Sequence, residues 1–281
     1  MWNFGAHSRT SWRSPIEKAA MALDKNTFVG IALAVAGIGI GTVLEGGALR
    51  QLMQPTAALI VLGGTLGAVM VQFPFPVVAQ AFVQLKNVFL RSGPSPDALV
   101  QHLLRFAYKA RREGLLSLDA ELNKVDDPFL KDSLMLAIDG VKADDLRKMM
   151  ELQLDYEGEK DERIARVFDA AGGFAPTFGI IGAVLGLIQV MQRLQNINEV
   201  GKGIAVAFVA TIYGVGSANL FFLPCAGKLR IRLREKQVIQ EMMLEAVLAI
   251  VEGVNPRALE LRLNSFATTP PKRWLEKVAV P

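Results

Sequence analysis

A small set of prolines, hydroxyls and amides lies inside otherwise apolar stretches of this chain, where few side chains could do chemistry. They are Thr65, Gln72, Pro176, Thr177, Thr211, Tyr213, Ser217, Asn219 and Pro224. A threonine hydroxyl can hydrogen-bond a hydrated ion, and a proline inside a helix kinks it and frees a carbonyl. For each threonine, the alternative is a hydrogen bond back to its own helix.

Ionisable side chains are missing from the same apolar stretches. They contain no Asp, Glu, Lys, Arg or His. Proton-coupled transporters normally place such a group in the membrane, because only it can carry the proton. If this chain handles ions, the titrating group must come from a partner.

Motifs for bond-making chemistry are absent. The sequence has no Walker loop and no H-E-x-x-H, G-x-S-x-G or C-x-x-C motif, so we expect no enzyme activity and no cofactor. His7 and His102 are far apart and unaccompanied, so we expect no metal site. Basic stripes interleaved with aromatics are also missing, so nucleic acid is not an expected partner.

The elements that must position the polar residues are four uncharged stretches. They are Thr27–Leu44, the centre Pro55–Phe73 of a longer uncharged run, Ala170–Gln192 and Gly203–Gly227. A membrane-spanning helix needs about 20 mostly apolar residues. The sequence therefore predicts a protein that crosses the membrane four times.

Basic residues are distributed very unevenly around these spans. Of the 31 Lys and Arg residues, only Arg50, Arg193 and Lys202 lie in the two short loops that follow the first and third spans. The positive-inside rule then places both termini and the large middle loop in the cytoplasm.

The predicted fold is all-α, with a helical cytoplasmic domain formed by the middle loop and the C-terminal tail. Ser95–Pro96–Asp97, Asp126–Asp127–Pro128 and Ala143–Asp144–Asp145 are helix-start signals, and a further helix is expected near Ser117. Gly114 and Gly140 are expected stops. The predicted division is 1–26, 27–85 with two spans, 86–169, 170–227 with two spans, and 228–281.

Three glycine pairs at four-residue spacing mark helix faces that can approach a neighbour closely. They are Gly37 and Gly41, Gly63 and Gly67, and Gly182 and Gly186. Packing within one subunit and packing between subunits both explain such faces, and the sequence leaves the choice open.

Four segments in order along the chain resemble the MotA family of flagellar stator subunits, with the MotC type nearest in character. They are Leu44–Gly47, Phe174–Leu187, Ala207–Gly214 followed by Asn219 and Pro224, and Glu252–Arg257. The resemblance extends over roughly residues 25 to 266.

The resemblance implies a subunit of an ion-driven stator. A homo-pentamer would surround the paired transmembrane helices of a MotB-type partner, whose aspartate binds the ion. Pro176 matches a proline near that aspartate, Pro224 matches one that ends the fourth span, and Thr211 matches the pore threonine; Thr177 follows Pro176 in this pathway.

The middle loop carries a second part of the resemblance. Arg111–Asp119 is similar to the segment that engages the rotor protein FliG through charged side chains. Arg111 would be the basic contact and Asp119 the acidic one, where the family more often has Glu. The alternative is an ordinary solvated helix edge.

The resemblance also bears on the choice of ion. Sodium-type stators usually have threonine at the positions of Ala183 and Ala210, and this chain has alanine at both. Sodium needs several oxygen ligands, whereas a proton needs only the partner aspartate and water. We therefore expect a proton-driven stator.

Two other interpretations remain open at this stage. One is an energy transducer like ExbB or TolQ, but those usually have three spans. The other is a membrane scaffold that passes no ions.

Overall fold

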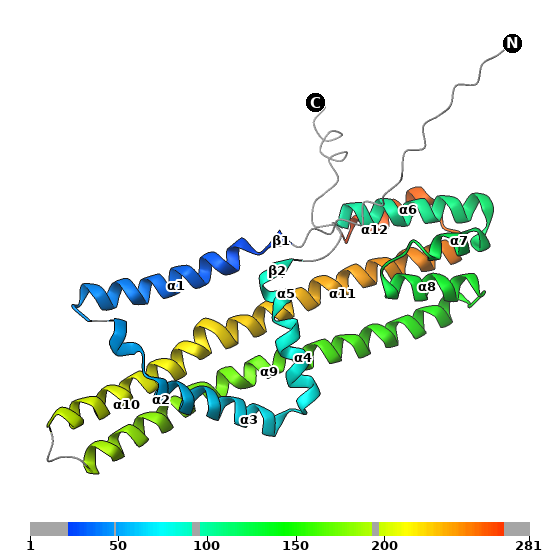
Figure 1. Ribbon diagram of the computed structural model, residues 1–281. Helices are drawn as coiled ribbons and strands as arrows, with labels where there is room; N and C mark the ends of the chain where they lie inside the picture. Colours follow the sequence, from blue (N-terminus) through cyan, green and yellow to red (C-terminus); the bar gives the residue numbers. More distant parts are fainter. Residues whose placement is uncertain (1–21, 48, 92–95, 193–196, 267–281) are drawn as a thin grey trace, which may run out of the picture. The chain divides into compact units, whose positions relative to one another are not determined.

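The computed structural model describes residues 22–47, 49–91, 96–192 and 197–266, and nearly all of its elements are helices (Figure 1). The exception is an antiparallel pair of two-residue strands, β1 (Ala22–Leu23) and β2 (Leu90–Arg91). A ladder this short leaves no alternating pattern in the sequence. The all-α prediction is therefore confirmed.

All four predicted spans are helices long and apolar enough to cross a membrane. The first is α1 (Lys25–Leu44), and the second runs through α2 (Pro55–Ala58), the π turn η3 (Leu59–Gly63) and α3 (Gly64–Gln72). The third is the C-terminal part of α9 (Ala143–Gln192). The fourth starts in α10 (Ile197–Ser217) and continues through the π turn η5 (Ala218–Phe222) into α11 (Leu223–Val251).

The remaining elements connect or follow the spans. The turn η2 (Leu49–Leu52) precedes the second span, and α4 (Phe75–Gln84) and α5 (Lys86–Phe89) follow it. The middle region contains α6 (Pro96–Glu113), the 3-10 turn η4 (Leu115–Leu118), α7 (Asp119–Leu122) and α8 (Pro128–Ile138), and α12 (Pro256–Asn264) comes last.

Helix signals in the described part of the middle region agree with the structure, and the expected start residue Ser95 lies outside the described residues. The side chain of Asp127 accepts a hydrogen bond from the Leu130 amide at 3.0 Å, which caps α8. Gly114 and Gly140 have φ angles of 83° and 82°, a left-handed conformation that favours glycine at a helix end. The helix beginning at Ala143 continues for 50 residues into the third span.

That continuity follows from the charged segment between the two predicted helices. Residues 157–169 contain no proline, and their apolar residues Ile164, Val167 and Phe168 are buried on one face of α9. A helix of 50 residues is about 75 Å long, well beyond the roughly 30 Å hydrocarbon core. Part of α9 must therefore lie outside the membrane.

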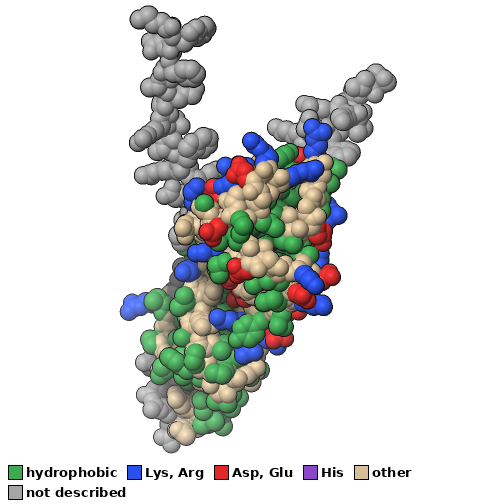
Figure 2. Space-filling view, turned by 90° about the vertical axis from the view of Figure 1, so that its right-hand side faces the viewer, with side chains coloured by type: hydrophobic (Ala, Val, Ile, Leu, Met, Phe, Trp, Pro, Cys, Tyr) green, Lys and Arg blue, Asp and Glu red, His purple; other side chains and the backbone are tan. Residues whose placement is uncertain are grey.

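The helices form two compact units. In the described part of the chain, one unit comprises residues 96–150 and 239–266, and the other residues 22–91 and 151–238. These units group residues by their contacts in space, whereas the sequence divided the chain into spans and cytoplasmic segments. The predicted division into spans and cytoplasmic segments stays a prediction. In Figure 2, most of the charged side chains in view gather apart from a region covered by hydrophobic ones.

The unit built on α6 has an apolar core. Helix α6 packs against η4 and α12, and α8 packs against η4 and α7. The largest fully buried side chains of this unit are Leu99, Leu103, Leu118, Phe129, Leu130, Leu134, Leu146, Met150, Met242, Met243, Leu248 and Leu259. This core fixes the turn between α6 and α7, where the charged segment Arg111–Asp119 lies.

The other unit is organised by a glycine seam, the line along which α9 and the α10 helix run antiparallel with backbones in contact. A Cβ added to Gly214 would lie 2.6 Å from the carbonyl oxygen of Ala175 and 2.9 Å from the Cα of Gly179. At Gly186 it would lie 3.1 Å from the amide nitrogen of Ala207, and at Gly203 2.4 Å from the Val190 side chain. Only glycine permits this approach.

For one of the three glycine pairs, the seam decides between packing within one subunit and packing between subunits. Gly182 and Gly186 pack against α10 of the same chain. A Cβ at Gly37, Gly41, Gly63 or Gly67 would meet nothing within 4 Å, and α1 has no buried residue. These faces are available to lipid or to other chains.

A glycine pair on the fourth span tests the seam. Gly214→Ala should destabilise the protein by about 1–3 kcal/mol, because its methyl group meets backbone atoms that cannot rotate away. The measurement is the midpoint of thermal unfolding in detergent. Gly216→Ala is the matched control, since a Cβ there meets nothing within 4 Å and alanine favours helix by about 1 kcal/mol. Equal destabilisation by both variants would contradict the seam.

Candidate functional site

Pro224 lies just past the π turn η5 of the fourth span and is exposed in this chain. Proline has no amide hydrogen to donate, and its ring clashes with the carbonyl of the preceding turn in a regular α-helix. The chain widens there instead, and the Leu223 amide donates to the carbonyl of Ala218, five residues back. Such π turns often occur at functional sites.

Pro176 lies inside α9, which remains helical on both sides of it. The carbonyl without an i+4 amide donor is that of Gly172. A Cβ on Gly172 would lie 2.6 Å from the Leu223 side chain. The two prolines therefore lie on facing stretches of α9 and α11, within about one turn of this contact.

Two further predicted residues, Thr211 and Ala210, lie along the seam. Thr211 is half-buried, and its hydroxyl donates to the Ala207 carbonyl of its own helix at 3.4 Å. Ala210 has no exposed surface and faces Gly182, whose added Cβ would lie 2.9 Å from the Ala210 Cβ. Ala183 is half-buried and Thr177 is exposed. The structure thus joins Ala210 and Thr211 to α9 but directs Thr177 away from the buried seam.

The burial of Ala210 adds a constraint that the sequence did not contain. Ala210 has no exposed surface, so a threonine at this position would have to fit two extra atoms into a packed contact. A side-chain oxygen at position 210 would therefore require a change in the local packing of α9 and α10.

A tyrosine on the fourth span fixes the start of the second span. The Tyr213 hydroxyl donates to the Leu52 carbonyl at 2.5 Å and accepts from the Gln54 amide at 3.3 Å. Nearby, Ala57, Val61, Val209 and Ala210 form a buried apolar cluster. Sequence reasoning named Tyr213 only as a polar residue, because its partners are backbone groups.

Charged side chains gather next to the predicted spans, and sequence reasoning missed them. Asp24, just before α1, pairs with Lys228 at 2.6 Å and with Arg232 at 2.7 Å, both on α11. The hydrogen bond from Lys228 holds the pKa of Asp24 below its ordinary value, so it is ionised at neutral pH. These contacts hold the beginning of the first span.

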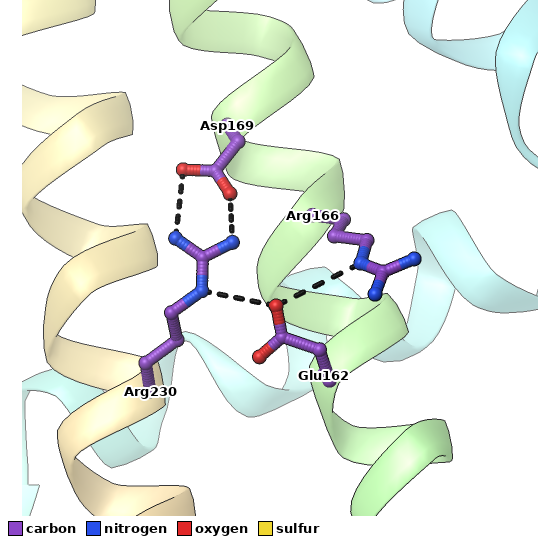
Figure 3. Close-up of polar contacts among 4 residues, drawn as sticks. All are labelled: Glu162, Arg166, Asp169 and Arg230. Carbon is purple, nitrogen blue, oxygen red and sulfur yellow. Dashed lines mark hydrogen bonds and ion pairs between the residues drawn. The ribbon is translucent and has the colours of Figure 1, made fainter.

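A second charged group joins α9 to α11 (Figure 3). Arg230 donates through Nε to Glu162 at 3.0 Å and through its two terminal nitrogens to the carboxylate of Asp169. Arg166 shares Glu162 at 3.7 Å. The signal was present in the sequence, since Glu162 and Asp169 are seven residues apart and share a helix face, but their partner is distant along the chain.

The proposed rotor-contact segment keeps its two predicted residues exposed. Arg111 lies in the last turn of α6 and Asp119 begins α7, and among the described residues neither side chain has a hydrogen bond or ion pair. By contrast, Glu121 pairs with Lys109 at 2.7 Å and with Lys124 at 3.0 Å. The hydrogen bond from Lys109 lowers the pKa of Glu121. Arg111 and Asp119 are therefore available to a partner, whereas Glu121 is engaged within the fold.

Within the described residues, no group of three or more His, Cys, Asp or Glu side chains is arranged to hold a metal ion. His102 contacts the ring of Phe106 with centroids 4.4 Å apart, and desolvation lowers its pKa. His7 lies outside the described residues.

Comparison with known proteins identifies two family models along the chain. Residues 28–114 match "Motility protein A N-terminal", and residues 121–243 match the "MotA/TolQ/ExbB proton channel family". Motility protein A of Bacillus subtilis is 35% identical over 87% of this chain and 91% of its own length. Motility protein A of Helicobacter pylori is 33% identical over 89% of this chain and 98% of its own length.

Solved structures agree with these relatives. The C. jejuni MotAB structure has a TM-score of 0.84 at 33% identity and covers 89% of this chain and 98% of the matched chain. The flagellar MotAB stator complex of Bacillus subtilis has a TM-score of 0.82 at 34% identity, and the match covers 92% of this chain and 100% of the matched chain. This chain belongs to the motility protein A family.

Proposed function

We propose that this chain is the MotA-type subunit of a flagellar motor stator, which conducts ions with a MotB-type partner and converts their flow into torque. The observation that carries the proposal is the agreement with two MotAB stator structures over 89% and 92% of the chain. The match to the N-terminal model of motility protein A includes the first two spans and favours a stator over an ExbB-like transducer.

The ion pathway in this proposal combines residues of this chain with a carboxylate from the partner. The four uncharged stretches contain no Asp, Glu, Lys, Arg or His. The stretch that carries Pro176 is opposite the stretch that carries Pro224. Moving one charge through 100 mV releases about 2.3 kcal/mol. A proline interrupts helix hydrogen bonding, so this is where we expect the ion step to change the helix geometry.

Protons are the ion that the seam favours. Positions 183 and 210 both carry alanine, which has no side-chain oxygen, and Ala210 is fully buried against Gly182. Sodium would lack ligands at both positions. The proposed assembly is a homo-pentamer in the inner membrane, with both termini cytoplasmic and with α1 facing lipid or neighbouring copies.

The central test replaces Pro176 by alanine in cells whose own copy of the gene is deleted. Deletion should stop swimming while the flagella remain, and Pro176→Ala should fail to restore it, although the protein reaches the membrane at normal levels. Alanine restores the amide donor to the Gly172 carbonyl and removes the interruption. Swimming at the wild-type speed would contradict the pathway, and flagellated deletion cells that still swim would contradict the function.

The ion preference is tested by changing the driving force. Swimming speed should follow the proton-motive force and should not depend on external sodium. Ala183→Thr alone should leave this dependence unchanged, because position 210 still offers no oxygen ligand. A speed that collapses without sodium but survives a protonophore would overturn the preference.

The rotor contact predicts a graded response to charge changes at Arg111 and Asp119. Reversal should impair motility more than neutralisation, because it adds repulsion to the lost attraction. Single exposed pairs are worth only about 0–1 kcal/mol, so one neutralisation should be mild and the double neutralisation severe. A compensating reversal on FliG should partly restore swimming. Arg111→Glu with Asp119→Lys is the decisive variant, and its normal swimming on an unmodified rotor would place the contact elsewhere.

A further inference from the structure

Arg230 on α11 pairs with Glu162 and Asp169 on α9, and we call this group the ionic clamp. The guanidinium of Arg230 is planar, and it contacts two carboxylates of one helix at once (Figure 3). Seven residues separate Glu162 from Asp169, which is about 10.5 Å along the helix axis. A slide of α11 by a single turn, about 5.4 Å, would therefore break both contacts.

The membrane-spanning part of the seam supplies no comparable restraint. Its close contacts join glycine and alanine atoms, as at Gly179, Gly186 and Gly214. Within the described residues, no hydrogen bond or ion pair connects α9 to α10 there. These steric contacts set how closely the two backbones approach, but they include no directional hydrogen bond of the kind that Arg230 makes.

The clamp is close to the residues of the proposed pathway on both helices. Asp169 is seven residues before Pro176 on α9, and Arg230 is six residues after Pro224 on α11. Resting on the proposed stator function, we propose that Arg230 is a positioning residue that fixes the register of Pro224 relative to Pro176 while ions pass. With a loosened clamp, ions still cross, but the helix movement that they cause is lost as sliding and produces less torque.

A second ion-paired residue on the same helices provides a matched control. Lys236 donates to Glu157 and to Asp161, each at 3.1 Å, and its side chain is 47% exposed, against 41% for Arg230. Lysine is a flexible point charge, whereas the arginine fork fixes geometry. Loss of Lys236 removes a similar amount of charge pairing without removing the fork.

The test compares Arg230→Gln, Arg230→Lys and Lys236→Gln, each coexpressed with the MotB-type partner. Three quantities are measured: protein in the membrane, acidification of the cytoplasm by ion influx, and torque on a bead at high load. Arg230→Gln should leave the amount of protein in the membrane and the ion influx near the wild-type values. Torque should fall about fivefold or more, since fivefold is the lower end of typical coupling free energies between sites. The torque of Arg230→Lys should lie between those of Arg230→Gln and the wild type, and the torque of Lys236→Gln should equal that of the wild type.

Exchanging the charges of Arg230 and Asp169 distinguishes a positioning role of Arg230 from a role in folding. Arg230→Asp combined with Asp169→Arg restores one ion pair between the helices and should recover a substantial part of the torque. Normal torque in Arg230→Gln would overturn the proposal. So would a parallel fall in membrane level, influx and torque in both Arg230→Gln and Arg230→Lys, because that result describes a folding role. Absence of influx and torque in the wild-type complex would instead count against the stator function.

Discussion

The close approach of the α9 and α10 backbones is the constraint on which the membrane-spanning part of this protein depends. In lipid, apolar side chains gain little by leaving one hydrocarbon surface for another, so helices associate through close packing. Gly214 against Ala175 and Gly179 provides that packing at distances that exclude any side chain. The same seam decides which pathway residues are buried and which are exposed.

Polar contacts fix the positions of elements that lie outside the seam between α9 and α10. Tyr213 fixes the start of the second span to backbone groups of Leu52 and Gln54. Asp24 holds the beginning of the first span, and Arg230 joins the third and fourth. Each contact places a strong, directional hydrogen bond at the end of a span, where water reduces the cost of ionisation.

Magnitudes bear on where an ion step can move the helices. One charge crossing 100 mV releases about 2.3 kcal/mol. Arg230 makes three hydrogen bonds, but its side chain is 41% exposed, and solvent reduces an exposed ion pair to about 0–1 kcal/mol. The prolines have already lost a helix hydrogen bond, so a movement of the helix there breaks no further backbone contact.

The sequence by itself determined the four spans, the helix starts in the middle region and the family, because each depends on local composition or on motifs in order. It also placed Pro176, Thr211 and Pro224 on the third and fourth spans. Tertiary structure alone decided that Ala210 is buried against Gly182 and that Arg230 meets Glu162 and Asp169. Those facts depend on the axial register of two helices that are separated along the chain, and periodicity within one helix carries no information about its register against another.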